Sequence, residues 1–397
     1  MNFYDTMKRF YGPARLSGKD WAGLFGALLL LFSAATAQKE TKSQSPPPQT
    51  QKRAERLKVS AKPLVVEKKL FFQKASLGTV TSILPARLQL DSQSAFWIAA
   101  EWGAASVTDS GKLRSSVRFE RMGGKVAPVD MDGDGNFEFI SRGGGQEEIR
   151  LFDREGRQLW KYGLGMDPAA GDASCGDLNG DGQLECVVGM KGAGGIRLLD
   201  KNGRERWRKP DLSVWHVEVL DWDGDGKNEI LHTNAAGQLR VRNANGEIVR
   251  ELPGNNFITL FNLCRWPETD SGWFILSNNN RTGIQLIDFK DNVVAAIPTT
   301  AKGYEAVGTP VRLEAEGKPY FAMLVCNCTP RRDSRLYLYD PDGDIIYEEK
   351  LLPSQAALLA VPDEITPGLE TLLVGEGEGK VWQYRLVPAT PSSRGTH

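Results

Sequence analysis

Short apolar runs separated by polar turns recur along most of the chain, and one arrangement of them repeats. In most copies an apolar run ends at an Asp or Asn, a Gly follows two or three residues later, and a second run begins. Alternating apolar runs bounded by such turns predict β-hairpins. The turn residue falls at Asp109, Asp153, Asp200, Asn243, Asp288 and Asp340, with spacings of 43 to 52 residues.

A last copy at residues 381–384 keeps the same step, so the chain contains seven units of about 45 residues. Each unit has room for four short strands, which is typical of one blade of a β-propeller. The sequence therefore predicts an all-β fold, a seven-bladed β-propeller of four-stranded blades over residues 64–387.

The seventh unit, residues 357–387, has only three strand-like runs, at 357–361, 370–374 and 380–386. The one unassigned strand-like segment is at residues 64–73, on the other side of the repeats. We therefore predict that residues 64–73 supply the missing outer strand and close the ring, which removes exposed sheet edges.

The N-terminal region has a different composition. Basic residues precede an apolar run at residues 21–34, and Ala35-Thr36-Ala37 fits a signal-peptidase site. We interpret residues 1–37 as a cleaved export signal, which implies a secreted, periplasmic or cell-surface protein; the alternative is a membrane anchor at residues 21–37. Residues 38–63, rich in Gln, Lys, Ser and Pro, predict a disordered linker, and residues 388–397 a disordered tail.

Composition narrows the possible partners. The 397-residue chain has a formal net charge of -1 and no basic stripe, so nothing favours a nucleic-acid partner.

Five cysteines in an exported chain allow disulfides. Cys175 and Cys186 flank an Asp-rich stretch on adjacent predicted strands, where a disulfide can join them. Cys264 is most simply a buried apolar residue, and the pair Cys326 and Cys328 makes a weak metal site.

Three Asp- and Gly-rich stretches share one spacing, at residues 130–138, 177–185 and 221–229. Oxygen-bearing side chains occupy positions 1, 3, 5 and 9 of each stretch, and Gly occupies positions 4 and 6, which permits a sharp turn. Four side-chain oxygens and one backbone carbonyl suit a hard cation, and Ca²⁺ accepts irregular geometry more readily than Mg²⁺. We therefore predict about three structural calcium ions on adjacent blades.

An EF-hand loop opens in the same way but places a bidentate Glu at position 12, between two helices. Here position 12 is Ser141, Val188 or His232, the acid stands at position 9, and a short apolar strand follows. The stretches therefore connect the first and second strands of units two, three and four. A solvated turn without metal is the simpler interpretation of one such stretch, but not of three with the same spacing.

These stretches resemble the FG-GAP and VCBS repeats, the calcium-loop propellers of integrin α-subunits and of many bacterial secreted proteins. The resemblance implies that calcium is bound by the side chains at positions 1, 3, 5 and 9 and the carbonyl at position 7. The implied ligands are Asp130, Asp132, Asp134, Asn136 and Glu138; Asp177, Asn179, Asp181, Gln183 and Glu185; and Asp221, Asp223, Asp225, Lys227 and Glu229.

The chain departs from these families by having Glu rather than Asp at position 9. The repeats also lack the Phe-Gly and Gly-Ala-Pro phrases, so the bacterial branch is the closer likeness. Trp160 and Trp207 end Gly-Arg-x-x-Trp phrases that look like the repeats of quinoprotein-type propellers.

Catalysis has little support in the sequence. None of the three histidines, His216, His232 and His397, lies in a nucleophile or metalloprotease motif, so we predict no catalytic residue. The leading hypothesis is a non-enzymatic binding or scaffold module that engages a protein or a carbohydrate on a propeller rim. The alternative is a propeller enzyme, either a polysaccharide lyase or a quinoprotein-like oxidoreductase.

Overall fold

The computed structural model describes residues 64–85, 95–119, 125–142, 148–163, 168–254, 256–258, 260–265, 273–279, 283–300, 305–316, 318–328, 333–354 and 357–388. The predicted export signal or anchor, the linker and residues 389–397 of the predicted tail lie outside these ranges. The described part holds 28 β-strands and one 3-10 helix, η1 (Ala75–Leu77), and no helix in it is long and apolar enough to cross a membrane.

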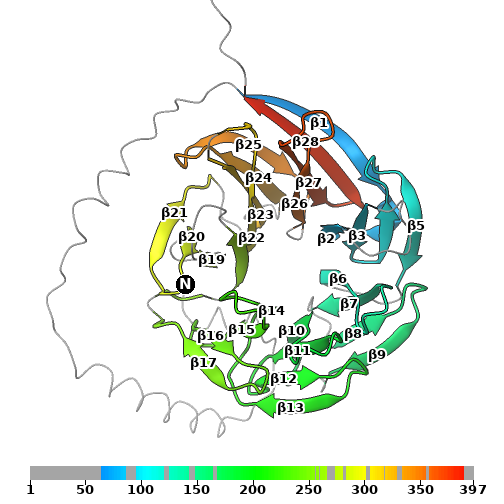
Figure 1. Cartoon of the computed structure of the whole chain (residues 1–397), viewed down its shortest axis with the longest axis vertical. Helices are drawn as coiled ribbons and strands as arrows, with labels where there is room; N and C mark the ends of the chain where they lie inside the picture. The colour runs from blue at the N-terminus through cyan, green and yellow to red at the C-terminus, as the bar shows by residue number, and fades with distance from the viewer. Residues whose placement is uncertain are drawn as a thin grey trace, which may run out of the picture. The chain divides into compact units, whose positions relative to one another are not determined.

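The strands form seven antiparallel four-stranded sheets around a common axis, so the predicted seven-bladed β-propeller is confirmed (Figure 1). Each blade follows the chain from its inner to its outer strand. The first three blades contain β2 (Val80–Pro85), β3 (Phe96–Ala100), β4 (Gly103–Val107) and β5 (Leu113–Arg118); β6 (Lys125–Val129), β7 (Glu138–Arg142), β8 (Ile149–Phe152) and β9 (Gln158–Tyr162); and β10 (Ala170–Gly176), β11 (Glu185–Met190), β12 (Ile196–Leu199) and β13 (Glu205–Lys209).

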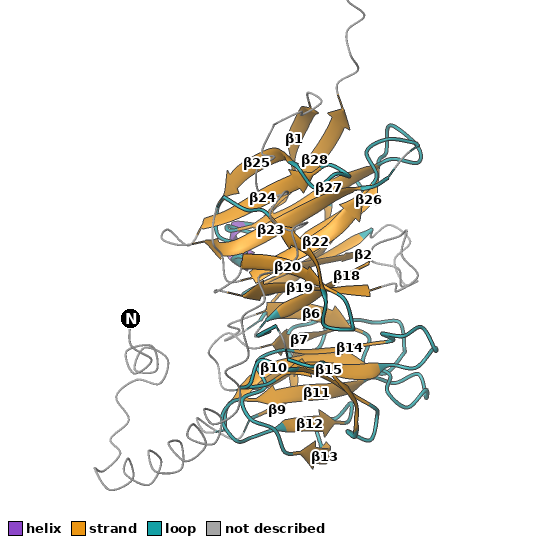
Figure 2. Cartoon of the chain, turned by 90° about the vertical axis from the view of Figure 1, so that its left-hand side faces the viewer, coloured by secondary structure: helices purple, strands orange, loops and turns teal. Residues whose placement is uncertain are grey.

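The next three blades have the same order, and Figure 2 shows their strands from the side with the loops at the strand ends. They contain β14 (Val217–Leu220), β15 (Glu229–Thr233), β16 (Leu239–Arg242) and β17 (Ile248–Glu251); β18 (Phe261–Arg265), β19 (Trp273–Asn279), β20 (Gly283–Ile287) and β21 (Val293–Ile297); and β22 (Glu305–Val311), β23 (Tyr320–Cys328), β24 (Asp333–Tyr339) and β25 (Ile345–Leu351).

The seventh blade combines the two ends of the described chain. Its inner strands are β26 (Leu358–Pro362), β27 (Glu370–Glu376) and β28 (Lys380–Pro388), and its outer strand is β1 (Leu64–Gln73). The antiparallel register runs from Leu64 opposite Pro388 to Gln73 opposite Lys380, so the predicted ring closure is confirmed.

The hairpin turns between the third and fourth strands repeat one hydrogen-bond pattern. In the second blade the Asp153 N–H donates to the Arg157 carbonyl, and the Gly156 N–H donates back to the Asp153 carbonyl. In the first blade Thr108 makes the equivalent bonds, and its hydroxyl accepts the Lys112 N–H at 3.0 Å. The predicted turn residue of the first blade, Asp109, is therefore wrong by one position. The turn residue is Thr108, whose hydroxyl replaces the Asp carboxylate of the other blades.

Neighbouring blades pack through apolar side chains that point sideways from each sheet. Between the seventh and first blades, Phe72, Leu77, Ile98 and Leu373 belong to one buried cluster. Comparable clusters lie at each of the other blade junctions in the described chain. Each blade therefore buries apolar side chains against both of its neighbours, and this burial stabilises the ring.

The two Gly-Arg-x-x-Trp tryptophans also connect blades. The Trp160 indole N–H donates to the Lys201 carbonyl at 2.9 Å, and the Trp207 indole N–H donates to the Ala244 carbonyl at 3.0 Å. Each tryptophan thus connects an outer strand to the hairpin turn of the next blade. This contact between blades accounts for the repeated Gly-Arg-x-x-Trp phrase.

A disulfide joins Cys175 and Cys186, which lie opposite each other on β10 and β11. The pairing that the cysteine positions allowed is therefore present. Cys264 and Cys326 are buried, and burial raises the pKa of Cys264 to about 12. The side chain of Cys328 lies outside the described part.

Ring closure predicts unequal effects for two residues of β1. Phe72 is 5% exposed within the cluster between the seventh and first blades, whereas Leu70 on the same strand is 47% exposed. Phe72→Ala should lower the free energy of unfolding by about 3–5 kcal/mol, because it leaves a cavity at the seam. Leu70→Ala, the matched control, should cost less than about 1 kcal/mol. Denaturant unfolding measures both, and equal losses would contradict the assignment of β1 to the seam.

Candidate metal sites in the second to fourth blades

The three Asp-rich stretches form loops between the first and second strands of the second, third and fourth blades, as predicted. All three have the same internal hydrogen bonds. The carboxylate at position 1 accepts the N–H groups of both glycines: Asp130 from Gly133 and Gly135, Asp177 from Gly180 and Gly182, and Asp221 from Gly224 and Gly226. The donor-to-acceptor distances lie between 2.6 and 3.2 Å.

The rest of each loop continues this arrangement. The side-chain oxygens of Asp132, Asn179 and Asp223 at position 3 accept the N–H of position 5. The carboxylates of Asp134, Asp181 and Asp225 at position 5 accept the N–H of position 7, which is Asn136, Gln183 and Lys227. The position 9 carboxylates of Glu138, Glu185 and Glu229 accept the N–H of position 2.

The glycines make this geometry possible. All six have φ between 74° and 87°, in the region that a side chain disfavours. With the backbone turned in this way, the side chains at positions 1, 3, 5 and 9 lie near one another on the same short loop.

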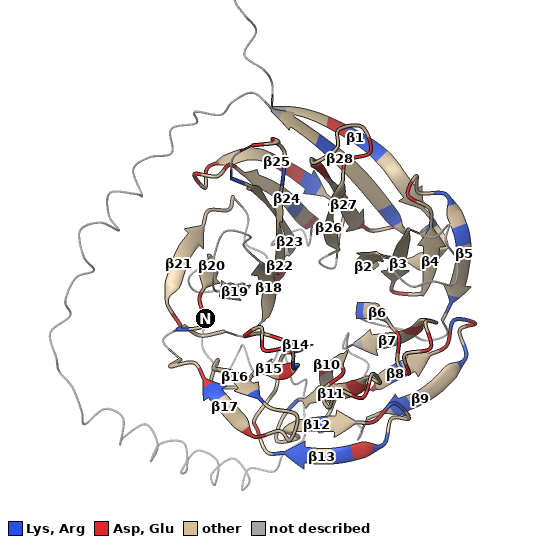
Figure 3. Cartoon of the chain, in the orientation of Figure 1, with Lys and Arg blue, Asp and Glu red and all other residues tan. Residues whose placement is uncertain are grey.

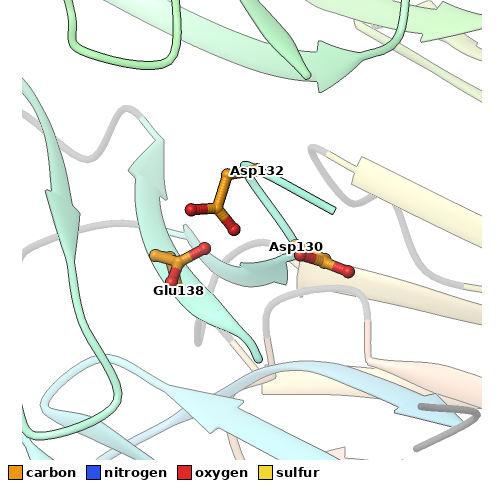
Figure 4. Close-up of side chains that lie close together, drawn as sticks. All are labelled: Asp130, Asp132 and Glu138. Atoms are coloured by element: carbon orange, nitrogen blue, oxygen red, sulfur yellow. The ribbon is translucent and has the colours of Figure 1, made fainter. Parts of the chain in front are cut away.

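The structure brings three carboxylates together in two of the three loops. The oxygens of Asp130, Asp132 and Glu138 lie within 4.8 Å of one another, and Figure 4 shows these side chains grouped on their loop. In the fourth blade the oxygens of Asp221, Asp223 and Asp225 form the second such group. Asp134 and Glu229, which the resemblance also implies as ligands, do not belong to these groups.

The glutamates at position 9 have raised pKa values, because they are partly buried and lie near the other carboxylates of their loops. Burial, and to a smaller extent the neighbouring aspartates, raises the pKa of Glu138 to about 6 and that of Glu229 to about 7. The pKa of Glu185 is raised in the same way, by burial and then by Asp181 and Asp177. A cation among these oxygens would relieve the repulsion, so the donor set of carboxylates and carbonyls fits a hard ion such as Ca²⁺.

The loop of the third blade differs at position 3. Asn179 replaces the Asp of the other two loops, and its side-chain amide donates to Asp181 at 3.1 Å and to Glu185 at 2.8 Å. The loop therefore holds three carboxylates rather than four, and an amide N–H lies between two of them.

The three loops also contact one another. The Leu184 N–H of the middle loop donates to the Met131 carbonyl at 3.1 Å, and the Asn228 amide donates to the Asp177 carbonyl at 2.8 Å. They form one connected acidic arc on one rim, whereas Lys and Arg recur on outer strands such as β5, β9 and β13 (Figure 3).

Sequence reasoning missed a group of charged side chains that the fold gathers in the channel. His216 Nδ1 lies 2.5 Å from Asp172 Oδ2, and its Nε2 lies 3.3 Å from Glu218 Oε1. Lys125 of the second blade forms an ion pair with Glu305 of the sixth blade, across the axis. Only His216 was noticed in the sequence, since these residues are distant along the chain and share no motif.

This channel cluster lies at the opposite end of the channel from the Asp-rich loops. Lys125 and Glu305 each begin an inner strand, and His216 directly precedes β14, whereas the loops follow the ends of inner strands. Burial by itself would lower the pKa of His216, but Asp172 and then Glu218 outweigh it and raise the pKa to about 9. His216 is 4% exposed, and its raised pKa favours the protonated form between the two carboxylates.

Comparison with known proteins supports the loops as repeats. A family model described as an FG-GAP-like repeat matches residues 130–188 and 177–232. The matches begin at Asp130 and Asp177 and together include all three loops. A search of curated proteins finds no match.

One solved structure among those compared shares the architecture with a TM-score above 0.5. A streptogramin B lyase structure aligns with a TM-score of 0.51 and 14% identity, covering 81% of this chain and 98% of that chain. Two structures of BBS1N in complex with ARL6DN, soaked with mercury and with lead, have TM-scores of 0.49 and 0.47 and identities of 12% and 11%. They cover 82% and 81% of this chain and 96% and 99% of theirs. At 14% identity the likeness to the lyase structure shows the fold alone, and the two BBS1N structures, with TM-scores below 0.5, support no conclusion.

The channel cluster predicts a pH-dependent stability. The pKa of His216 in the folded protein, about 9, lies above its usual value of 6.5, so folding strengthens proton binding at this residue. The contribution is complete below pH 6.5 and is lost as the pH rises through 9; a shift of this size corresponds to roughly 3 kcal/mol.

Denaturant unfolding of the wild type and His216→Gln at pH 6.5 and pH 9.5 measures this contribution. The wild type should be more stable than the variant at pH 6.5 and lose most of that advantage at pH 9.5, while other titrating groups cancel between the two proteins. A constant difference across the range would show that His216 does not act as a buried cation.

Proposed function

Because the chain is a seven-bladed β-propeller with FG-GAP-like repeats in its second, third and fourth blades, we propose that it is an exported, calcium-stabilised binding module for a protein or a glycan. The observation that carries the calcium part is the hydrogen-bonded frame shared by the three loops, which holds oxygen donors at the same four positions in each. Each ion would be held by the side chains at positions 1, 3, 5 and 9.

Calcium in these loops has a structural role. A divalent ion supplies positive charge to carboxylates that otherwise repel one another. The side-chain oxygens at positions 1, 3, 5 and 9 also accept the hydrogen bonds that fix the turn. Since the loops contact one another, their stabilisation strengthens the junctions between the second, third and fourth blades.

Export is supported by two features. Residues 1–37 have the pattern of an export signal, with a membrane anchor at residues 21–37 as the alternative. The Cys175–Cys186 disulfide is consistent with an oxidising compartment such as the periplasm or the cell exterior.

The binding part is supported by exposed apolar side chains on the rim opposite the Asp-rich loops. Leu212, Trp215 and Phe257 are 61%, 38% and 44% exposed, on the segments that lead into β14 and β18. The segments are held together, since the Leu212 carbonyl accepts the Ala235 N–H and the Gly237 carbonyl accepts the Ile258 N–H. We call Leu212, Trp215 and Phe257 the apolar rim patch.

The segment that presents Leu212 and Trp215 is anchored by hydrogen bonds to Asp211. The Asp211 carboxylate accepts two hydrogen bonds from Arg240 at 2.8 and 2.9 Å and one from Arg242 at 3.0 Å. The adjacent Ser213 has a φ of 44°, a conformation that a side chain disfavours and that the surrounding structure must hold. Exposed large apolar side chains on a strained, anchored segment are typical of an interaction surface.

The enzyme alternative stays a prediction. Among the described residues, the channel cluster is the group most like catalytic machinery, but its histidine is buried between two carboxylates. No specific observation favours the lyase or the quinoprotein reading over the binding module.

Calcium titration of the protein from residue 38 onward, by calorimetry with thermal melting, tests the calcium part. About three ions should bind and raise the melting temperature, each site adding roughly 2.7 kcal/mol at a calcium concentration 100 times its Kd. Asp221→Asn should remove about one ion, because it deletes the charge at position 1 of the loop in the fourth blade. Asp342→Asn, in a hairpin turn of the sixth blade, is the matched control and should leave the stoichiometry unchanged. Absence of calcium binding in the wild type would overturn this part of the proposal.

Hydrogen exchange with and without chelator locates the effect. Chelation should increase exchange in the second to fourth blades before the fifth to seventh, because the ions brace only the former. Uniform protection under both conditions would contradict a structural role for the ions.

Photo-crosslinking in the native cell tests the apolar rim patch. A photoreactive amino acid at position 212 should give a discrete cross-linked species, while the same amino acid at the exposed position 249 of outer strand β17 should not. Equal yields from the two positions would remove the patch as the binding surface.

A further inference from the structure

The disulfide lies at the base of the middle Asp-rich loop. Cys175 is the penultimate residue of β10, Cys186 is the second residue of β11, and the loop of the third blade lies between them. The two cysteines face each other in the antiparallel register, with a Cα–Cα distance of 4.1 Å. The bond therefore closes the loop covalently, two residues before its first predicted ligand, Asp177, and one residue after its last, Glu185.

The neighbouring loops have no such cross-link. At the equivalent register positions the second blade has Pro128 opposite Phe139, and the fourth blade has Val219 opposite Ile230. The three loops share a frame and a strand context, so the chain contains one cross-linked loop and two internal controls.

The cross-linked loop is also the one with the weakest donor set. It has carboxylates only at Asp177, Asp181 and Glu185, because position 3 is Asn179. With one negative charge fewer, it attracts a divalent cation less strongly than its neighbours do. Its affinity therefore depends more on how little the loop must be ordered when the ion binds.

We propose that the Cys175–Cys186 disulfide is a positioning element for the middle calcium site, and that its reduction weakens calcium binding at this site selectively. The inference rests on the calcium binding proposed above. The cross-link restricts the separation of the two loop ends, so fewer loop conformations compete with the binding arrangement. In the reduced chain the loop keeps its hydrogen bonds but loses this restriction.

The redox step is a two-electron exchange. A dithiol transfers two electrons and two protons to the disulfide, which becomes the two thiols of Cys175 and Cys186 while the dithiol becomes a disulfide. Cys186 is fully buried among the side chains between the second and third blades, whereas Cys175 is only half-buried. The Cys175 sulfur is thus the more accessible point of attack.

Calorimetric calcium titration of the protein from residue 38 onward, oxidised and after treatment with dithiothreitol, tests the proposal. Three sites should be occupied in the oxidised protein, and one of them should weaken roughly tenfold on reduction. Hydrogen exchange of residues 177–184, compared with 130–137 and 221–228, identifies the affected loop. The oxidised protein should require less calcium than the reduced protein to protect residues 177–184.

The variant Cys175→Val/Cys186→Ile copies the apolar pair of the fourth blade and supplies the control. It should show the weakened middle site without any reductant, and dithiothreitol should then change nothing, although Cys264, Cys326 and Cys328 are still present. If this variant does not fold, the reversible reduction of the wild type still decides the question.

The outcomes separate the two proposals. The positioning role would be overturned if reduction left the affinity of each of the three sites unchanged, or if it weakened all three sites equally. Either result would leave the proposed calcium binding intact. No calcium binding by the oxidised protein would instead overturn the proposed calcium binding, and this inference with it.

Discussion

Closure of the ring by β1 and β28 is the interaction on which the rest of the structure depends. Every blade buries apolar side chains against two neighbours, so an open arc would expose two apolar faces and two sheet edges. The pairing of Leu64 through Gln73 with Lys380 through Pro388 removes both. The first and last described strands therefore stabilise blades to which they are not adjacent.

The two ends of the channel have different chemistry because one end is formed by the starts of the inner strands and the other by their ends. Loops that follow the inner strands of the second to fourth blades place the acidic arc on one rim. The starts of inner strands place Lys125, Asp172, His216 and Glu305 at the other end, beside the apolar rim patch. The proposed calcium binding and the proposed ligand contact therefore involve opposite rims and different residues.

The middle Asp-rich loop differs from the other two in its number of carboxylates and in the disulfide at its base. The outer two loops contain four carboxylates, and their strand ends are held by apolar pairs. The middle loop has an amide at Asn179 and a covalent bond at its base. Charge and covalent restriction are alternative ways to favour one arrangement of a short polar loop.

The sequence by itself determined the blade count, the closing strand and the position of the three loops, because each rests on local patterns that repeat. Period-two alternation, Asx and Gly turns and the spacing of the Asp-rich loops are properties of short segments, and repetition separates them from chance. The turn of the first blade was predicted one residue out of register, because the Thr108 hydroxyl accepts the backbone N–H that an Asp carboxylate accepts in the second blade. Only the tertiary structure showed the ion pair of Lys125 with Glu305 and the enclosure of His216 between two carboxylates, since those contacts join segments as far as 180 residues apart and leave no local pattern.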